Sequence, residues 1–205
     1  MIAVLGNAGL ALAAAMAVTT IIACAAAGTS RKAGWLTAAR WTLVLSACAF
    51  LIAATALGTA LVAGDLRFTY VSSHTELALT PAYRLAAFWS GQEGSLLLWA
   101  LMISGFAAAA GMIRKRVAAA GEGVTLSVLA ALDLFFGTLL LFAANPFALE
   151  TEVGIDGMGL NPQLQHWAMI AHPPMLFMGY AGFAVPFAIM CGALAAGRRD
   201  NLWVN

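Results

Sequence analysis

Five stretches of this sequence are almost free of charged residues, and each is long enough to cross a lipid bilayer as an α-helix. A helix needs about 20 apolar residues to cross a hydrocarbon core roughly 30 Å thick. Lipid offers the backbone no hydrogen-bond partners, so each stretch must pair its own amides and carbonyls as a helix. We expect spans at about residues 3–27, 41–64, 94–113, 123–144 and 173–197.

The low share of charged residues supports the same fold class. Charged residues make up 9% of the chain and hydrophobic residues 62%, whereas soluble domains carry about 25% charged residues. A β-barrel would show alternating segments of about ten residues instead of continuous apolar runs. The sequence therefore predicts an all-α integral membrane protein in contact with lipid. Its formal net charge of +1 argues against a nucleic-acid partner.

The basic residues predict the orientation, because loops rich in Lys and Arg stay in the cytoplasm. The segments after spans one, three and five carry eight basic residues, and the other two connections carry only Arg67 and Arg84. We therefore expect the N-terminus outside and the C-terminus in the cytoplasm. The eight are Arg31, Lys32, Arg40, Arg114, Lys115, Arg116, Arg198 and Arg199.

The two outer connections, residues 65–93 and 145–172, are the long ones, and long loops on one face often carry function. Residues 68–71 predict a short extended segment. Thr80 followed by Pro81 is typical of a helix start. We expect a short amphipathic helix in the membrane interface from that point.

All three histidines, His74, His166 and His172, fall on the outer side. His172 precedes Pro173 and Pro174 at the expected start of the fifth span. The positive end of a helix dipole disfavours imidazolium there, and the neutral ring is the form that ligates metals. A capping histidine with no ligand is the alternative, because one imidazole alone lacks partner ligands.

Inside the spans, the side chains with possible chemistry are Asp133 and three cysteines. Asp133 should face the bundle interior, because a carboxylate costs about 3 kcal/mol in a bilayer on insertion scales. It would either form part of a proton or substrate path in a transporter or quinone-handling subunit, or be protonated and bonded to a neighbouring helix. The cysteines form no Cys-X-X-Cys pair and are interpreted as structural; they are Cys24, Cys48 and Cys191.

Two segments resemble signatures of the CcmF-type cytochrome c heme lyases. Residues 83–99 end in Gln-Glu-Gly-Ser-Leu-Leu-Leu-Trp and are similar to the family's W-G-x-H-E-G-S-L-L-L-W. Residues 159–165 and 172–182 are similar to its L-N-P-L-L-Q and H-P-P-x-L-Y-x-G-Y-x-G. Residues 145–147, Asn-Pro-Phe, resemble a further family motif. The likeness runs in order over essentially the whole chain.

The resemblance implies a part in cytochrome c maturation in the bacterial inner membrane, with the functional face in the periplasm. Such a lyase takes b-type heme from a periplasmic heme chaperone and holds it transiently. The heme vinyl groups then react with the thiols of a Cys-X-X-Cys-His apocytochrome c. Thiol-reducing and presenting factors of the apocytochrome are further expected partners. A related lyase that serves a nitrite-reductase cytochrome is the nearest alternative.

The resemblance also implies site residues. His172, in the His-Pro-Pro motif, would be an external axial ligand of the heme iron. Arg67 and Arg84 are candidates to bind the heme propionates, because guanidinium pairs well with carboxylate; lipid headgroups are their alternative partners. Trp89 and Trp99 are candidates for the wall of the pocket. No residue is assigned a catalytic role.

The sequence departs from the family pattern at several positions. Gln92 stands where the family has His, His74 where it has Asn, and Phe177 where it has Tyr. The family's Trp-rich external segment and further histidine ligands are absent from residues 1–205. We expect these residues to form the N-terminal membrane module of a lyase, as a split subunit or a piece of a longer chain. Covalent attachment of heme would need the C-terminal remainder.

Overall fold

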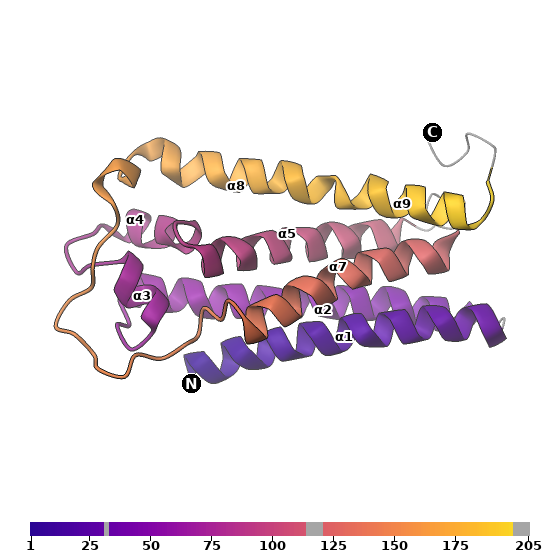
Figure 1. Cartoon of the computed structure of the whole chain (residues 1–205), viewed down its shortest axis with the longest axis horizontal. Helices are drawn as coiled ribbons and strands as arrows, with labels where there is room; N and C mark the ends of the chain where they lie inside the picture. Colours follow the sequence, from indigo (N-terminus) through magenta and orange to yellow (C-terminus); the bar gives the residue numbers. More distant parts are fainter. Residues whose placement is uncertain (31–32, 114–120, 199–205) are drawn as a thin grey trace.

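The computed structural model describes residues 1–30, 33–113 and 121–198. Five segments among them are long and apolar enough to cross a membrane, and they lie side by side in one bundle (Figure 1). The fifth consists of two consecutive helices, α8 and α9. The expected all-α membrane fold with five spans is confirmed. The long helices are α1 (Ile2–Ser30), α2 (Ala33–Ala63), α5 (Gln92–Met112), α7 (Glu122–Phe142), α8 (Trp167–Gly182) and α9 (Ala184–Ala195).

Small residues let the first spans pack closely, as is usual where lipid and side chains are equally apolar. A Cβ on Gly9 of α1 would lie 2.8 Å from the carbonyl oxygen of Ala49 in α2. A Cβ on Gly137 of α7 would lie 3.2 Å from the Cβ of Ala14 in α1. Helices α1, α2 and α7 therefore form a tightly packed part of the bundle.

The helix of the second span begins at Ala33, earlier than the start expected at residue 41. The charge of Arg40 predicts that the span starts after this residue. Arg40 is instead buried and forms an ion pair with Glu122 at the start of α7. Because its charge is paired inside the protein, the helix can continue through this position.

The fifth span also begins earlier than expected, at Trp167 instead of residue 173. His166 is its N-cap, and the ring Nδ1 accepts a hydrogen bond from an amide of the first turn. The second outer connection therefore ends at His166. α8 ends at Gly182, whose carbonyl has no backbone N–H donor four residues on, because that residue is Pro186. The span then continues as α9.

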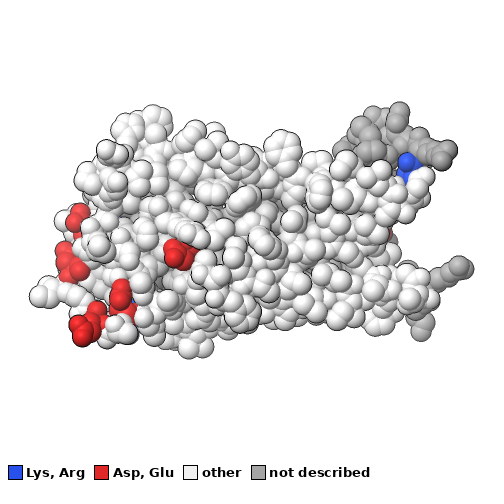
Figure 2. Space-filling view, in the orientation of Figure 1, with Lys and Arg blue, Asp and Glu red and all other residues white. Residues whose placement is uncertain are grey.

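The short elements gather at one end of the bundle, near the start of α1, and acidic side chains are concentrated over the same end (Figures 1 and 2). Thr80 and Pro81 begin a helix, as expected. The extended segment expected at residues 68–71 was wrong, because only Phe68 is extended, in a bridge with Leu149. The short elements are α3 (Thr69–His74), α4 (Pro81–Ala86), η1 (Ala87–Trp89) and η2 (Pro162–Leu164).

Candidate functional site

His172 lies in the second turn of α8, and not at the helix start that the two prolines had indicated. The helix runs without a break through Pro173 and Pro174. The dipole argument for a neutral ring therefore loses its basis, since that effect is confined to the first turn. The side chain is exposed, and within the part of the chain that the structure describes it has no hydrogen-bond partner. Its ring nitrogens are accessible for binding.

The other two histidines each use a ring nitrogen to hold local structure. Nδ1 of His166 accepts a hydrogen bond from the backbone amide of Ala168 at 3.2 Å. Nδ1 of His74 lies 2.9 Å from the carbonyl oxygen of Tyr70, and the two rings stack with centroids 4.4 Å apart. Hydrogen bonding therefore distinguishes His172 from both.

The face of α8 around His172 is apolar and open. Met175 and Leu176 follow at helical spacing, and they are 64% and 45% exposed. Gly179, two turns along, adds no side chain, and a Cβ there would meet nothing within 4 Å. A planar apolar ligand can lie against such a face beside a free imidazole.

The two tryptophans expected in a pocket wall both contact α8. The indole N–H of Trp89, at the end of η1, donates to the carbonyl oxygen of Met169 at 2.7 Å. The ring of Trp99 in α5 packs near Phe177 and Tyr180 of α8, with centroids 6.0 and 6.4 Å away. Residues 83–99 and 172–182, the two segments with signature motifs, therefore pack against each other.

Tyr70 holds the turn that leads into α5, a role that nothing in the sequence pattern indicated. Its hydroxyl lies 2.9 Å from the carbonyl oxygens of Ala87 and Phe88, and it accepts a hydrogen bond from the Gly91 amide at 3.1 Å. Burial raises the pKa of Tyr70, so the hydroxyl keeps its proton and can donate. A Cβ on Gly94 would overlap the Phe88 carbonyl oxygen and the Tyr70 hydroxyl. The glycine of Glu-Gly-Ser is thus required by close backbone approach.

Arg67 and Arg84 already have partners within the chain. Arg67 donates two hydrogen bonds of 2.7 Å to the carboxylate of Asp65. These bonds lower the pKa of Asp65, which therefore stays charged. Arg84 donates to three backbone carbonyls, those of Leu77 at 2.7 Å, Leu79 at 3.1 Å and Val62 at 3.3 Å. A heme propionate would have to compete with Asp65 for Arg67, or use the N–H groups of Arg84 that remain.

Asp133 lies inside the bundle, as expected, and is completely buried. The Ser46 hydroxyl of α2 donates to its Oδ2 at 2.8 Å and also lies 3.4 Å from the Ala13 carbonyl oxygen of α1. Oδ1 has no hydrogen-bond partner among the described residues. Asp133 is therefore hydrogen-bonded to one neighbouring helix, α2, and Ser46 in turn contacts α1.

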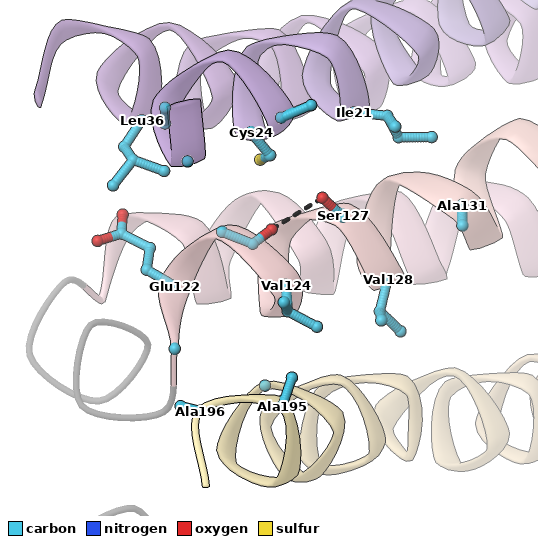
Figure 3. Close-up of a pocket in the computed structure, with 16 residues that line it drawn as sticks. Ile21, Cys24, Leu36, Glu122, Val124, Ser127, Val128, Ala131, Ala195 and Ala196 are labelled. Atoms are coloured by element: carbon cyan, nitrogen blue, oxygen red, sulfur yellow. Dashed lines mark hydrogen bonds between the residues drawn. The ribbon is translucent and has the colours of Figure 1, made fainter. Parts of the chain in front are cut away.

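A cavity of about 760 Å³ opens between α1, α7 and α9 (Figure 3). It lies at the end of the bundle away from the short helices and from the start of α1. Small apolar residues line most of it, and the Ser127 hydroxyl donates to the Gly123 carbonyl at 2.8 Å. Cys24 and Glu122 also line it. The described residues contain no group of three or more His, Cys, Asp or Glu that could hold a metal ion.

Comparison with known proteins relates this chain to cytochrome c assembly. A family model described as "Cytochrome C assembly protein" matches residues 89–200. "Cytochrome c-type biogenesis protein CcmF" of Escherichia coli (strain K12) is 38% identical over 167 residues, which cover 80% of this chain and 25% of that protein. "Probable cytochrome c-type biogenesis protein NrfE" of the same strain is 36% identical, over 67% of this chain and 25% of that protein.

A solved structure named "Cytochrome c Heme Lyase CcmF" has the same fold over nearly the whole chain. The TM-score is 0.80 at 27% identity, and the match covers 98% of this chain and 32% of that one. This chain thus spans about a quarter of the length of these curated relatives and about a third of the solved lyase. The matched region of the family model contains Trp89, Trp99 and His172.

Proposed function

Because the chain belongs to the CcmF-type cytochrome c heme lyase family, we propose that it forms the N-terminal, heme-holding membrane module of such a lyase. The lyase activity would belong to an assembly that includes the remainder, since this chain spans only part of its relatives. The assembly would work in the bacterial inner membrane with its outer loops in the periplasm. Bound b-type heme would supply vinyl groups to the thiols of a Cys-X-X-Cys-His apocytochrome.

The observation that carries the proposal is the exposed, unpaired imidazole of His172 on an apolar helix face. The residues present fit one axial position of a heme, because a neutral imidazole binds iron and the neighbouring apolar side chains suit a porphyrin. The second ligand would come from the remainder of the lyase. Arg67 and Arg84 are the proposed propionate partners, and Trp89 and Trp99 the proposed pocket wall.

The partners follow from this role. A periplasmic heme chaperone would deliver the heme to the face of α8 that carries His172. Apocytochrome c, with its thiol-reducing and presenting factors, would meet the heme at the same face. Relatives named CcmF and NrfE match at 38% and 36% identity, so we extend the proposal to apocytochromes of this motif in general.

The test is His172→Gly in the assembled lyase. We expect loss of most bound heme and of cytochrome maturation, measured by heme absorbance and by covalent heme staining of the cytochrome. Added imidazole should restore part of both, because it can enter the space that the side chain leaves.

His166→Asn is the matched control. It removes a nearby histidine but keeps a side chain that caps helices well, so heme content should stay normal. A His172→Gly lyase with an unchanged heme spectrum and full maturation would contradict the proposal.

A further inference from the structure

The carbonyl of Met169 lacks its usual donor inside α8. In an α-helix each carbonyl accepts from the N–H four residues on, and four residues after Met169 is Pro173. Proline has no backbone N–H. A carbonyl left unpaired in a half-buried site is costly, so Met169 needs a donor from elsewhere in the protein.

Trp89 provides that donor from a segment 80 residues earlier in the chain. Its indole N–H reaches the Met169 oxygen at 2.7 Å. A helical carbonyl points along the axis toward the residue four positions on. The indole therefore lies beside Pro173, the residue next to His172 in the chain.

Trp89 is itself held firmly. The Ser95 hydroxyl, in the first turn of α5, donates to the Trp89 carbonyl at 3.0 Å. The Tyr70 hydroxyl contacts the carbonyls of Ala87 and Phe88, the two residues before Trp89. In Figure 1, α4 lies beside the first turns of α8, and the two helices are in contact. Trp89 is thus a fixed point on the outer end of the bundle.

The turn of α8 that carries His172 needs such a fixed point. α8 lies at the edge of the bundle, and its large side chains are widely exposed, as at Trp167 (71%) and Tyr180 (59%). The prolines also remove two internal hydrogen bonds from this part of the helix. Its first turns are therefore weakly held by α8 alone.

We propose that Trp89 is a positioning residue for His172. Its indole N–H donates to the Met169 carbonyl, which Pro173 leaves without a backbone donor. This hydrogen bond holds the turn of α8 that carries His172 against η1 and so sets the direction in which the imidazole points. The heme part of this inference rests on the proposed function. The hydrogen-bond part does not.

The experiment is a double-mutant cycle of Trp89→Phe and Pro173→Ala in the whole membrane-bound lyase. Trp89→Phe keeps an aromatic ring and removes the N–H. Amide hydrogen exchange in residues 167–176 should become about fivefold faster, the size expected for one hydrogen bond. The low-spin fraction in the heme absorbance spectrum should fall in the same variant, although His172 is still present.

Pro173→Ala returns a backbone N–H to the position that Met169 needs. In this background, Trp89→Phe should change the exchange rate and the heme spectrum by less than about twofold. Trp41→Phe, an exposed indole of α2 with 55% accessibility, is the matched control and should change neither readout.

Each outcome bears on a separate claim. Unchanged exchange in Trp89→Phe, or the same effect in both backgrounds, overturns the inference whatever the heme does. Faster exchange with an unchanged heme spectrum overturns the positioning role. A failure of the proposed function would appear instead as normal heme in His172→Gly.

Discussion

At the residue scale, several polar groups near the candidate site are paired within the chain, whereas the buried indole N–H of Trp99 and the exposed ring of His172 have no hydrogen-bond partner among the described residues. Arg67 pairs with Asp65, Arg84 with backbone carbonyls, and Trp89 with Met169. Buried or half-buried polar groups are normally satisfied in this way. An exposed His172 without a partner among the described residues is the group most available to an external ligand.

Asp133 is expected to tolerate Asn but not Leu. The Ser46 hydroxyl donates to a carboxyl oxygen of Asp133, and the amide oxygen of Asn can accept the same hydrogen bond. Leu leaves the Ser46 hydroxyl without this partner, which should cost about 1–3 kcal/mol. The measurement is the thermal unfolding of the detergent-solubilised protein, followed by circular dichroism.

The Asp133→Leu/Ser46→Ala double variant is the control. Removing both partners should recover much of the loss, because no polar group then remains unpaired. If Asp133→Leu alone unfolds at the temperature of the unmodified protein, the contact with Ser46 contributes nothing to stability.

At the element scale, the candidate site depends on how α5 begins and how α8 is held beside it. η1 leads into α5 through Ser90 and Gly91, and the Tyr70 hydroxyl of α3 is hydrogen-bonded to this turn. Trp89 and Trp99, at the two ends of this segment, reach α8 through a hydrogen bond and through ring contacts. The fifth span is thus placed by the segment that carries the other signature motif.

Gly94→Ala should weaken this junction. The new Cβ would overlap the Phe88 carbonyl, which is backbone and cannot move aside easily. We expect a loss of about 1–3 kcal/mol, as for overpacked sites, seen as a lower unfolding temperature. Gly105→Ala, in the same helix, meets nothing within 4 Å and should be neutral or slightly stabilising. Equal effects of the two substitutions would show that close approach at Gly94 is unimportant.

At the scale of the whole molecule, the bundle has two different ends. The long connections, the short helices and most acidic side chains lie together with the N-terminus of α1 (Figures 1 and 2). The fifth span brings α9 to the opposite end, where the cavity lined by Cys24 opens. This asymmetry suits a protein whose chemistry occurs on one side of a membrane. Of the eight basic residues that indicate the orientation, Arg40 and Arg198 are described; Arg31, Lys32, Arg114, Lys115, Arg116 and Arg199 lie outside the described residues.

The orientation itself is a prediction that reporter fusions can check. Alkaline phosphatase becomes active only outside the cytoplasm, where its disulfides form. A fusion after Val153 should be active, and a fusion after Arg116 inactive. The reverse pattern would put His172 on the cytoplasmic side and remove the basis of the proposed function.

The sequence by itself determined the fold class, the number of spans and the two segments that matter. An apolar run long enough to cross lipid must form a helix, because only a helix pairs all of its own backbone groups there. The five spans could therefore be predicted from the positions of the apolar runs in the sequence. The resemblance of residues 172–182 to the family's His-Pro-Pro motif likewise singled out His172 among the three histidines. These features are local in the sequence, so they can be recognised without knowing the fold.

Only the tertiary structure decided where the helices begin and which side chains are paired in ion pairs or hydrogen bonds. The charge of Arg40 predicts the end of a span, but its partner Glu122, 82 residues away in the sequence, pairs with it inside the fold. Pro173 predicts the start of a helix, but it lies inside α8, where the indole N–H of Trp89 donates to the Met169 carbonyl in place of the N–H that Pro173 lacks. A buried charge, or a carbonyl that a proline leaves without its N–H donor, is costly while it lacks a partner, and partners distant in sequence meet only in the folded chain.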